Sequence, residues 1–348
     1  DPEAAAHAVM QADLSQDLRL ESGQPLYHHA LLRLGDARWF WYQRYHHVAV
    51  DGFSFPAITR RIAAIYTAWR HEQTPEPSPF TPFSEVVEEY QRYQHSDTFT
   101  RDAAFWREQL PQLPPAATLS GEPLSGDLST TALHRFKRRF DSQDLARLVA
   151  HSGGQTLADM ALALTALWLG RLSGRNDFSA GFIFMRRLGS SALCATGPVL
   201  NVLPLGVRLD PDATLAQLAA SLSAQLKKMR RHQRYDAEQI LRDAGRVTGD
   251  QPLYGAVINL KMFDYQLDLD GIAGITHTLT TGPVKDLEIA LLPDEQGGLA
   301  LELLANAGRY DARELERHLD RLPLLLRQCA ARPEMRCADV DLLHADEQ

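Results

Sequence analysis

The chain has 348 residues, of which 45% are hydrophobic and 23% are charged, a balance typical of a globular protein large enough for two lobes. Its formal net charge of −8 argues against nonspecific nucleic-acid binding as the main role. No apolar run approaches the roughly 18 residues that a membrane-spanning helix needs, and no signal peptide is visible. Cys194, Cys329 and Cys337 lack metal-ligand spacing, so we expect free thiols and a cytoplasmic protein.

The first predicted elements are a strand and a helix joined by a short turn. Residues 38–50, RWFWYQRYHHVAV, are rich in aromatic and β-branched side chains, which favours a strand. Residues 54–70 follow with apolar side chains at helical spacing, and residues 83–110 are predicted to be helical. The Pro-, Gly- and Ser-rich segment 116–130 indicates a linker, so we predict one lobe over residues 1–115 and another over residues 131–348.

The second lobe is predicted to mix strands and helices without the alternation of a doubly wound sheet. Thr156 and Asp159 match a capping box and predict the start of a buried helix that ends near residue 172. An apolar stripe predicts a helix over residues 214–234, and Pro323 is expected to kink the last helix. The other expected elements are strands 136–140, 177–185, 202–210, 253–270, 286–293 and 298–305 and helices 144–151 and 312–329. The chain is therefore predicted to be of mixed α/β (α+β) class.

The stretch YHHVAVDGFSF, residues 45–55, combines two adjacent histidines with an aspartate and a glycine. If the strand continues, His46 and His47 point to opposite faces, and His47 shares a face with Asp51 across the small Ala49. One imidazole can then enter a cavity, and histidine is the side chain best suited to move a proton near neutral pH. We expect Asp51 to fix the turn or to orient an imidazole.

Three interpretations of this stretch remain open on the residues alone. It is a general base for acyl transfer, a metal site, or a structural histidine pair in a core. The metal site lacks an obvious third ligand, and neighbouring histidines on opposite strand faces cannot both bind one ion without a bulge. A second doublet, His28 and His29, is expected to be structural or on the surface.

HHVAVDG fits the HHxxxDG motif of the condensation domains of nonribosomal peptide synthetases. Further segments resemble the family in the same order, from about residue 10 to the end: RDAAFW (101–106), RNDFSAGFIFMRR (175–187), GPVLNVLPLGVRL (197–209) and HQRYDAEQI (232–240). The resemblance implies a chloramphenicol-acetyltransferase-like fold, with two lobes forming a V around a tunnel. It places a floor loop near residues 190–196 and a strand that crosses to the other lobe near residues 260–270.

The same resemblance implies an enzyme that forms an amide bond. The donor is expected as a thioester on the 4′-phosphopantetheine arm of an aryl carrier protein, and the acceptor amine on the arm of a peptidyl carrier protein. Within the family, the similarity is greatest to catecholate-siderophore synthetases, which implies 2,3-dihydroxybenzoate as donor and L-serine as acceptor. We expect no cofactor bound by the domain itself, no metal, and no nucleic-acid or membrane partner.

The motif assigns roles by position. His47 is implied to be the catalytic histidine, as a base or as a group that positions the amine, with His46 and Asp51 structural and Gly52 permitting the turn. The family's arginine partner for the aspartate lies in an N-terminal segment that this chain is expected to lack. Arg44 and Arg187 are alternatives for that partner, and neither is favoured.

Two further features have competing interpretations. Asn201 and Arg187 are candidates to line or support the tunnel, with plain strand structure as the alternative for Asn201. The basic run late in one helix either complements the helix dipole or docks an acidic carrier protein. This run comprises Lys227, Lys228, Arg230 and Arg231.

Other functions are less favoured by the same residues. Epimerisation uses the same histidine motif, but the EGHGRE-type segment of epimerases is absent, and heterocyclisation domains replace the histidines with aspartate. A free acyltransferase would act on soluble acyl-CoA, and a non-catalytic carrier-docking fragment is disfavoured by the intact motif. Amino-acid activation and product release are assigned to adjacent adenylation, carrier and thioesterase domains of the parent synthetase.

Overall fold

The computed structural model describes residues 1–121, 124, 130, 132–246, 252–262, 266–294, 298–343 and 347. The chain forms two compact units. Unit 1 comprises Asp1–Val87, Arg187–Val199 and Gln266–Thr276, and unit 2 comprises Glu88–Arg186, Leu200–Tyr265 and His277–Gln348. The lobe boundaries expected at residues 115 and 131 stay a prediction.

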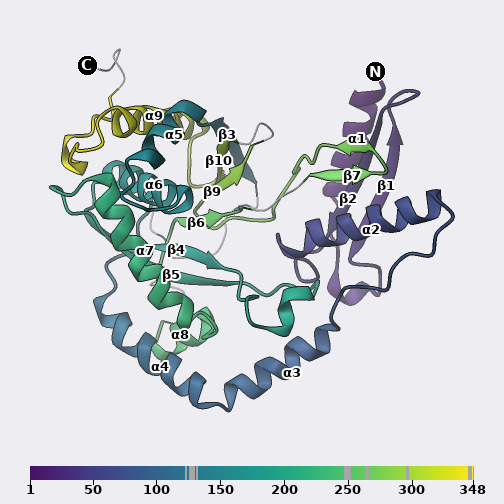
Figure 1. Cartoon of the computed structure of the whole chain (residues 1–348), viewed down its shortest axis with the longest axis horizontal. Helices are drawn as coiled ribbons and strands as arrows, with labels where there is room; N and C mark the ends of the chain where they lie inside the picture. Colours follow the sequence, from purple (N-terminus) through teal and green to yellow (C-terminus); the bar gives the residue numbers. More distant parts are fainter. Residues whose placement is uncertain are drawn as a thin grey trace. The chain divides into compact units, whose positions relative to one another are not determined.

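Unit 1 is built on an antiparallel strand pair, β1 (Tyr27–Arg33) and β2 (Trp39–Tyr45). Helix α1 (Pro2–Leu14) lies against one face of this pair (Figure 1). The Tyr42 hydroxyl donates to Asp13 Oδ2 of α1 at 2.7 Å, and Arg44 donates to the Asp13 carbonyl oxygen at 2.6 Å. Neither α1 nor β1 was predicted.

Helix α2 (Ser54–Arg70) has the bounds predicted for it. It faces the other side of the strand pair, where the Tyr45 and Phe55 rings meet edge to face with centroids 5.9 Å apart. The hairpin of β7 (Leu267–Leu269) and β8 (Ile272–Gly274) packs on α2, and His71 Nε2 lies 2.7 Å from Asp270 Oδ1. The single strand predicted over residues 253–270 is wrong, because β6 and β7 are separate strands in different units.

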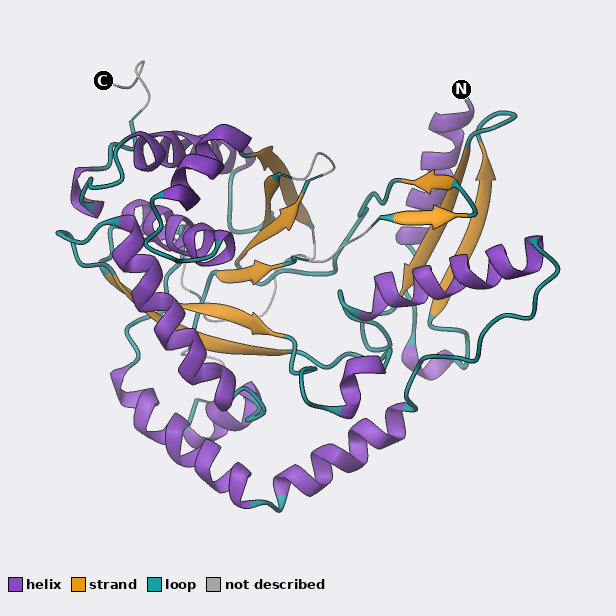
Figure 2. Cartoon of the chain, in the orientation of Figure 1, coloured by secondary structure: helices purple, strands orange, loops and turns teal. Residues whose placement is uncertain are grey.

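Unit 2 contains a mixed six-stranded sheet in the order β3-β10-β9-β6-β4-β5 (orange in Figure 2). Its two parallel pairings are β4 with β6 and β6 with β9, and its other pairings are antiparallel. The strands are β3 (Leu133–Arg139), β4 (Asp177–Phe184), β5 (Asn201–Arg208), β6 (Val257–Leu260), β9 (Leu287–Pro293) and β10 (Leu299–Asn306). Each overlaps a predicted strand, and the lack of βα alternation is confirmed.

The core of unit 2 surrounds α6 (Leu157–Ser173), which is apolar on all sides and buried from Met160 to Gly170. The predicted capping box is present, with Thr156 and Asp159 satisfying each other's backbone N–H groups. Helix α6 packs against α5 (Ser142–Ala150), α7 (Leu215–Arg231) and α9 (Ala312–Ala331). Helix α9 continues through Pro323.

The predicted helix over residues 83–110 is two helices, α3 (Phe83–Gln94) and α4 (Asp97–Gln109). Ser96 separates them, because its hydroxyl accepts from Phe99 N and caps a new helix. The short helix α8 (Ala237–Asp243) follows α7, which ends at 231 rather than at 234. Short 3₁₀ helices cover Leu20–Ser22, Leu110–Gln112, Ser191–Cys194 and Cys337–Asp339. No helix in the described part of the chain has the length and apolarity needed to cross a membrane.

The beginning of the predicted linker is bound to unit 2. Ala117 N donates to Ser179 O at 3.0 Å, and Ala256 N donates to Ala117 O at 3.0 Å. Thr118 Oγ1 donates to Asp286 Oδ1 at 2.9 Å. Residues 122, 123 and 125–129 of the predicted linker lie outside the described residues.

Candidate active site

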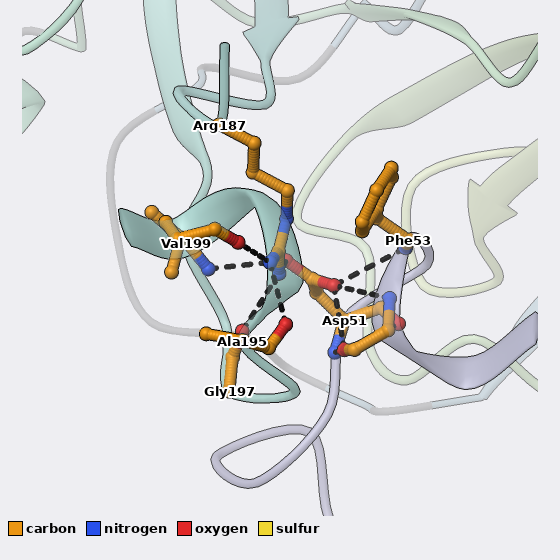
Figure 3. Close-up of polar contacts among 8 residues, drawn as sticks. Asp51, Phe53, Arg187, Ala195, Gly197 and Val199 are labelled. Atoms are coloured by element: carbon orange, nitrogen blue, oxygen red, sulfur yellow. Dashed lines mark hydrogen bonds and ion pairs between the residues drawn. The ribbon is translucent and has the colours of Figure 1, made fainter. Parts of the chain in front are cut away.

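Asp51 and Arg187 form a buried ion pair within unit 1 (Figure 3). Arg187 Nη2 donates to Asp51 Oδ2 at 2.7 Å, and the two side chains are 1% and 4% exposed. Of the two alternatives named for the partner of Asp51, neither of which was favoured, the structure shows Arg187. The other alternative, Arg44, is bound to Asp13. The ion-pair partner of the motif aspartate is therefore an arginine of this chain.

The Asp51 carboxylate also fixes the start of α2. Its Oδ1 accepts from Phe53 N at 3.1 Å, from Ser54 N at 2.9 Å and from Ser54 Oγ at 2.7 Å. Its Oδ2 accepts from Val199 N at 3.0 Å as well as from Arg187. Burial raises the pKa of Asp51, but the Arg187 guanidinium and the N–H groups of Val199 and Ser54 outweigh burial and hold it below its usual value. The carboxylate is therefore anionic at neutral pH, at a helix N-terminus that favours negative charge.

Arg187 holds the loop that follows it. Nη1 donates to the carbonyl oxygens of Ala192 and Ala195 at 2.6 and 2.8 Å, and Nη2 donates to Gly197 O at 2.7 Å (Figure 3). The guanidinium carbon lies 4.6 Å from the centre of the Phe53 ring. Loop 187–199 is thus folded around one buried cation, which ties the loop to the turn that contains Asp51.

The histidine pair lies in a turn rather than in a strand. Strand β2 ends at Tyr45, and His46 N makes one further bond to Leu26 O at 2.8 Å. Ala49 N then donates to His46 O at 3.0 Å and closes a turn over residues 46–49. The expectation that the two imidazoles occupy opposite strand faces, with His47 on the face of Asp51, is therefore wrong. His47 is exposed, and its imidazole makes no hydrogen bond with any residue that the structure describes.

The structure also bears on the metal alternative and on Gly52. Both Asp51 oxygens are occupied by donors, which leaves a metal ion without its expected carboxylate ligand. Gly52 lies in the turn before α2, outside the left-handed region, and a Cβ built there meets no atom within 4 Å. Gly52 therefore lies in the expected turn, but neither its backbone conformation nor the space around it requires a glycine there.

Asn201 is buried at the start of β5 and binds backbone groups of unit 2. Its Nδ2 donates to Gln233 O at 3.0 Å and to Tyr235 O at 2.8 Å. Its Oδ1 accepts from Ala237 N at 3.1 Å, the first N–H of α8. The side chain therefore holds the connection between α7 and α8. Its expected place in or beside the tunnel stays a prediction.

The basic run lies at the C-terminal end of α7, where positive charge complements the helix dipole. All four side chains are exposed, and none forms an ion pair with a described residue: Lys227, Lys228, Arg230 and Arg231. This arrangement is compatible with both interpretations of the run.

Three contributors to the site were not predicted, namely Phe53, Ser54 and Val199. Ser54 had a local signal, since an aspartate just before a predicted helix typically accepts from a backbone N–H two or three residues later. Phe53 and Val199 had no signal, because one acts through its ring face and the other through its backbone N–H.

The family model described as Condensation domain matches residues 1–348. The chain belongs to the condensation domain family. The resemblance seen in the HHxxxDG motif is thereby confirmed, and so is the activity it implies, because condensation domains of nonribosomal peptide synthetases are amide-forming acyltransferases.

Curated relatives and solved structures agree with this membership. The condensation domain is 59% identical to enterobactin synthase component F of Escherichia coli (strain K12), over 99% of this chain and 26% of that protein. It is 35% identical to vanchrobactin synthetase VabF of Vibrio anguillarum, over 92% of this chain and 11% of that protein. The chain thus spans about a quarter or less of the length of these relatives.

A solved relative confirms the predicted fold class. A mutant of the starter condensation domain of rhizomide synthetase RzmA, in complex with C8-CoA and Leu-SNAC, matches with a TM-score of 0.89 and 30% identity. The match covers 99% of this chain and 78% of that one. The mixed six-stranded sheet of unit 2 is consistent with the chloramphenicol-acetyltransferase-like architecture that was expected.

Proposed function

We propose that this condensation domain transfers a 2,3-dihydroxybenzoyl group to the amine of L-serine, with both held as thioesters on carrier proteins. The identity of 59% to enterobactin synthase component F supports this pair of substrates. The RzmA domain was solved with C8-CoA together with Leu-SNAC, which supports one donor and one acceptor for this chain as well.

His47 acts in this proposal as the group that receives the proton of the seryl amine or positions that amine. The amine nitrogen bonds to the thioester carbonyl carbon, the carbon–sulfur bond breaks, and the donor arm leaves as a thiol that takes up the proton. The amide product stays on the acceptor arm. A positioned base of this kind is worth about 10²–10⁴-fold in rate, and holding the two arms in place supplies much of the remainder.

One observation carries the role of His47, which is the way the turn presents it. The imidazole is exposed and is not engaged by any described residue, whereas both ends of its turn are fixed. His46 is bound to Leu26 on one side, and Asp51 is bound to Arg187 on the other. The fixed backbone limits where the imidazole can lie, and no described residue competes for its ring nitrogens.

The partners in the proposal are an aryl carrier protein for the donor and a peptidyl carrier protein for the acceptor. Their 4′-phosphopantetheine arms bring the substrates, so the domain needs no cofactor of its own. The exposed basic end of α7 is proposed to bind an acidic carrier surface. Adenylation, carrier and thioesterase domains of a parent synthetase would supply activation and release.

The proposal is tested by mixing this chain with dihydroxybenzoyl-loaded donor carrier and seryl-loaded acceptor carrier, followed by mass spectrometry of both carriers. We expect dihydroxybenzoyl-serine on the acceptor, and much less product with benzoyl donor or alanyl acceptor. Equal turnover of all four combinations would contradict the substrate assignment. Absence of product, here and in the full-length synthetase, would favour a carrier-docking role without catalysis.

A further inference from the structure

We propose that His46 is a positioning residue that builds the turn carrying His47, through a neutral imidazole whose hydrogen is on Nε2. The proposal deepens the function proposed above and rests on the role given there to His47. It assigns to the first histidine of the pair a defined hydrogen bond rather than a general structural role.

The turn is made by hydrogen bonds that His46 accepts. Ala49 N donates to His46 O at 3.0 Å, so His46 is the first residue of a four-residue β-turn and His47 is the second. Val48 N, from the third position, donates to His46 Nδ1 at 3.0 Å. The N–H groups of Val48 and Ala49 are thus both bound to His46, one to its side chain and one to its backbone.

This geometry is the one that asparagine and aspartate adopt at the first position of such turns. Their Oδ1 accepts from the N–H two residues later and favours the turn locally. Nδ1 of histidine and Oδ1 of asparagine are both attached to Cγ, so they reach the same N–H group. His46 therefore acts as an asparagine would, provided that Nδ1 carries no hydrogen. An imidazolium has N–H groups at both positions and cannot accept this bond.

Packing does little to hold the turn, which makes this hydrogen bond important. His47 is exposed, and Val48 is 50% exposed. The chain is fixed before the turn by the bond from His46 N to Leu26 O and after it by the buried Val50 and Asp51. Between these anchors the direction of the His47 side chain depends on the turn geometry that His46 sets.

The test compares His46→Asn with the matched variant His46→Gln, whose side-chain oxygen is one bond further out, and with His46→Ala. We expect His46→Asn to keep kcat within about threefold, and the other two to lower kcat about five- to tenfold, the size of one neutral hydrogen bond. KM for the loaded carriers should stay unchanged in all three. Thermal unfolding of each variant shows that it is folded.

Two NMR measurements on the unmodified chain and its variants do not depend on activity. The ¹⁵N shifts of the His46 ring should show the hydrogen on Nε2, and the Val48 amide should exchange faster in His46→Gln and His46→Ala than in His46→Asn. A hydrogen on Nδ1, or equal loss of kcat in the Asn and Gln variants, would overturn the proposal. If neither the unmodified chain nor the full-length synthetase makes the amide, the proposed function fails. The ring tautomer and the Val48 exchange rate still test the turn proposed for His46.

Discussion

At the scale of single residues, the site depends on one buried charge pair with many additional bonds. Asp51 accepts hydrogen bonds from Arg187, Val199, Phe53 and Ser54, so little of its charge is left uncompensated. A buried ion pair is stabilising only when further hydrogen bonds accompany it. Both terminal nitrogens of Arg187 are bonded, whereas its Nε is buried without a partner among the described residues. Asp51 is therefore part of the structure, and His47 is the side chain left for chemistry.

Removal of one partner from this pair should destabilise the protein strongly. We expect Arg187→Ala to lower the free energy of unfolding by about 3–5 kcal/mol, because it leaves a buried carboxylate without its cation. Arg187→Lys should recover only part of this loss, since an ammonium cannot reach the carboxylate and three carbonyl oxygens together. Denaturant unfolding measures the free energy of unfolding of both variants. Stability of Arg187→Ala close to that of the unmodified protein would show that the pair is not formed in solution.

Acid should weaken the same interaction. The pKa of Asp51 in the folded chain is held below its usual value of 3.8, chiefly by Arg187 and neighbouring N–H groups acting against burial. Its contribution to stability is therefore present above pH 3.8 and is lost as pH falls through the lower folded value. We expect the unfolding free energy of Asp51→Asn to depend less on pH below 4 than that of the unmodified chain. Parallel pH profiles for the two proteins would contradict this.

At the scale of elements, the sequence predicts what is encoded locally. The capping box at Thr156 and the bounds of α2 were predicted correctly, because each depends on residues a few positions apart. The end of β2 was missed, because aromatic and β-branched residues favour a strand up to residue 50 while His46 closes a turn. The bond between Asp51 and Arg187 joins residues 136 positions apart, so the sequence could name Arg187 only as one of two alternative partners and could not choose it over Arg44.

The role of Asn201 belongs to this scale, because it joins the start of β5 to the connection before α8. We expect Asn201→Ala to cost about 1–3 kcal/mol of stability, since it leaves buried carbonyl oxygens without donors. Asn201→Asp should be no better, because a carboxylate would face the carbonyl oxygens of Gln233 and Tyr235. Amide hydrogen exchange over residues 233–243 should become faster when these hydrogen bonds are lost. Unchanged exchange together with a raised KM would instead indicate contact with substrate.

At the scale of the whole molecule, the family could be identified from the motif and the segments around it, whereas the expected lobe boundaries at residues 115 and 131 stay a prediction. Residues 187–199 and 266–276 belong to unit 1 although they lie far along the chain. Composition alone pointed to a linker over residues 116–130, yet Ala117 and Thr118 are bound within unit 2. Proline and glycine content indicates where a chain lacks helices and strands, but not which unit a segment binds.

Carrier recognition is also a property of the whole molecule. The double substitution Lys227→Glu and Lys228→Glu should weaken binding of an acidic carrier about tenfold at low salt, with a smaller effect at high salt. Lys137→Glu, which changes an exposed lysine of β3, is the matched control. Titration with labelled carrier measures the affinity of each variant at low and at high salt. If the two variants bind the carrier with equal affinity, the basic run does not dock the carrier and only complements the helix dipole.

The central claim is that His47, presented by a turn fixed at both ends, promotes amide formation. The most direct measurement is the single-turnover rate with both carriers preloaded, for the unmodified chain, His47→Ala and the control His151→Ala, an exposed histidine after α5. We expect His47→Ala to slow amide formation by about 10²–10⁴-fold and His151→Ala to leave it unchanged. A rate for His47→Ala within about threefold of the unmodified chain would contradict the claim, because a positioned base cannot be removed at so small a loss.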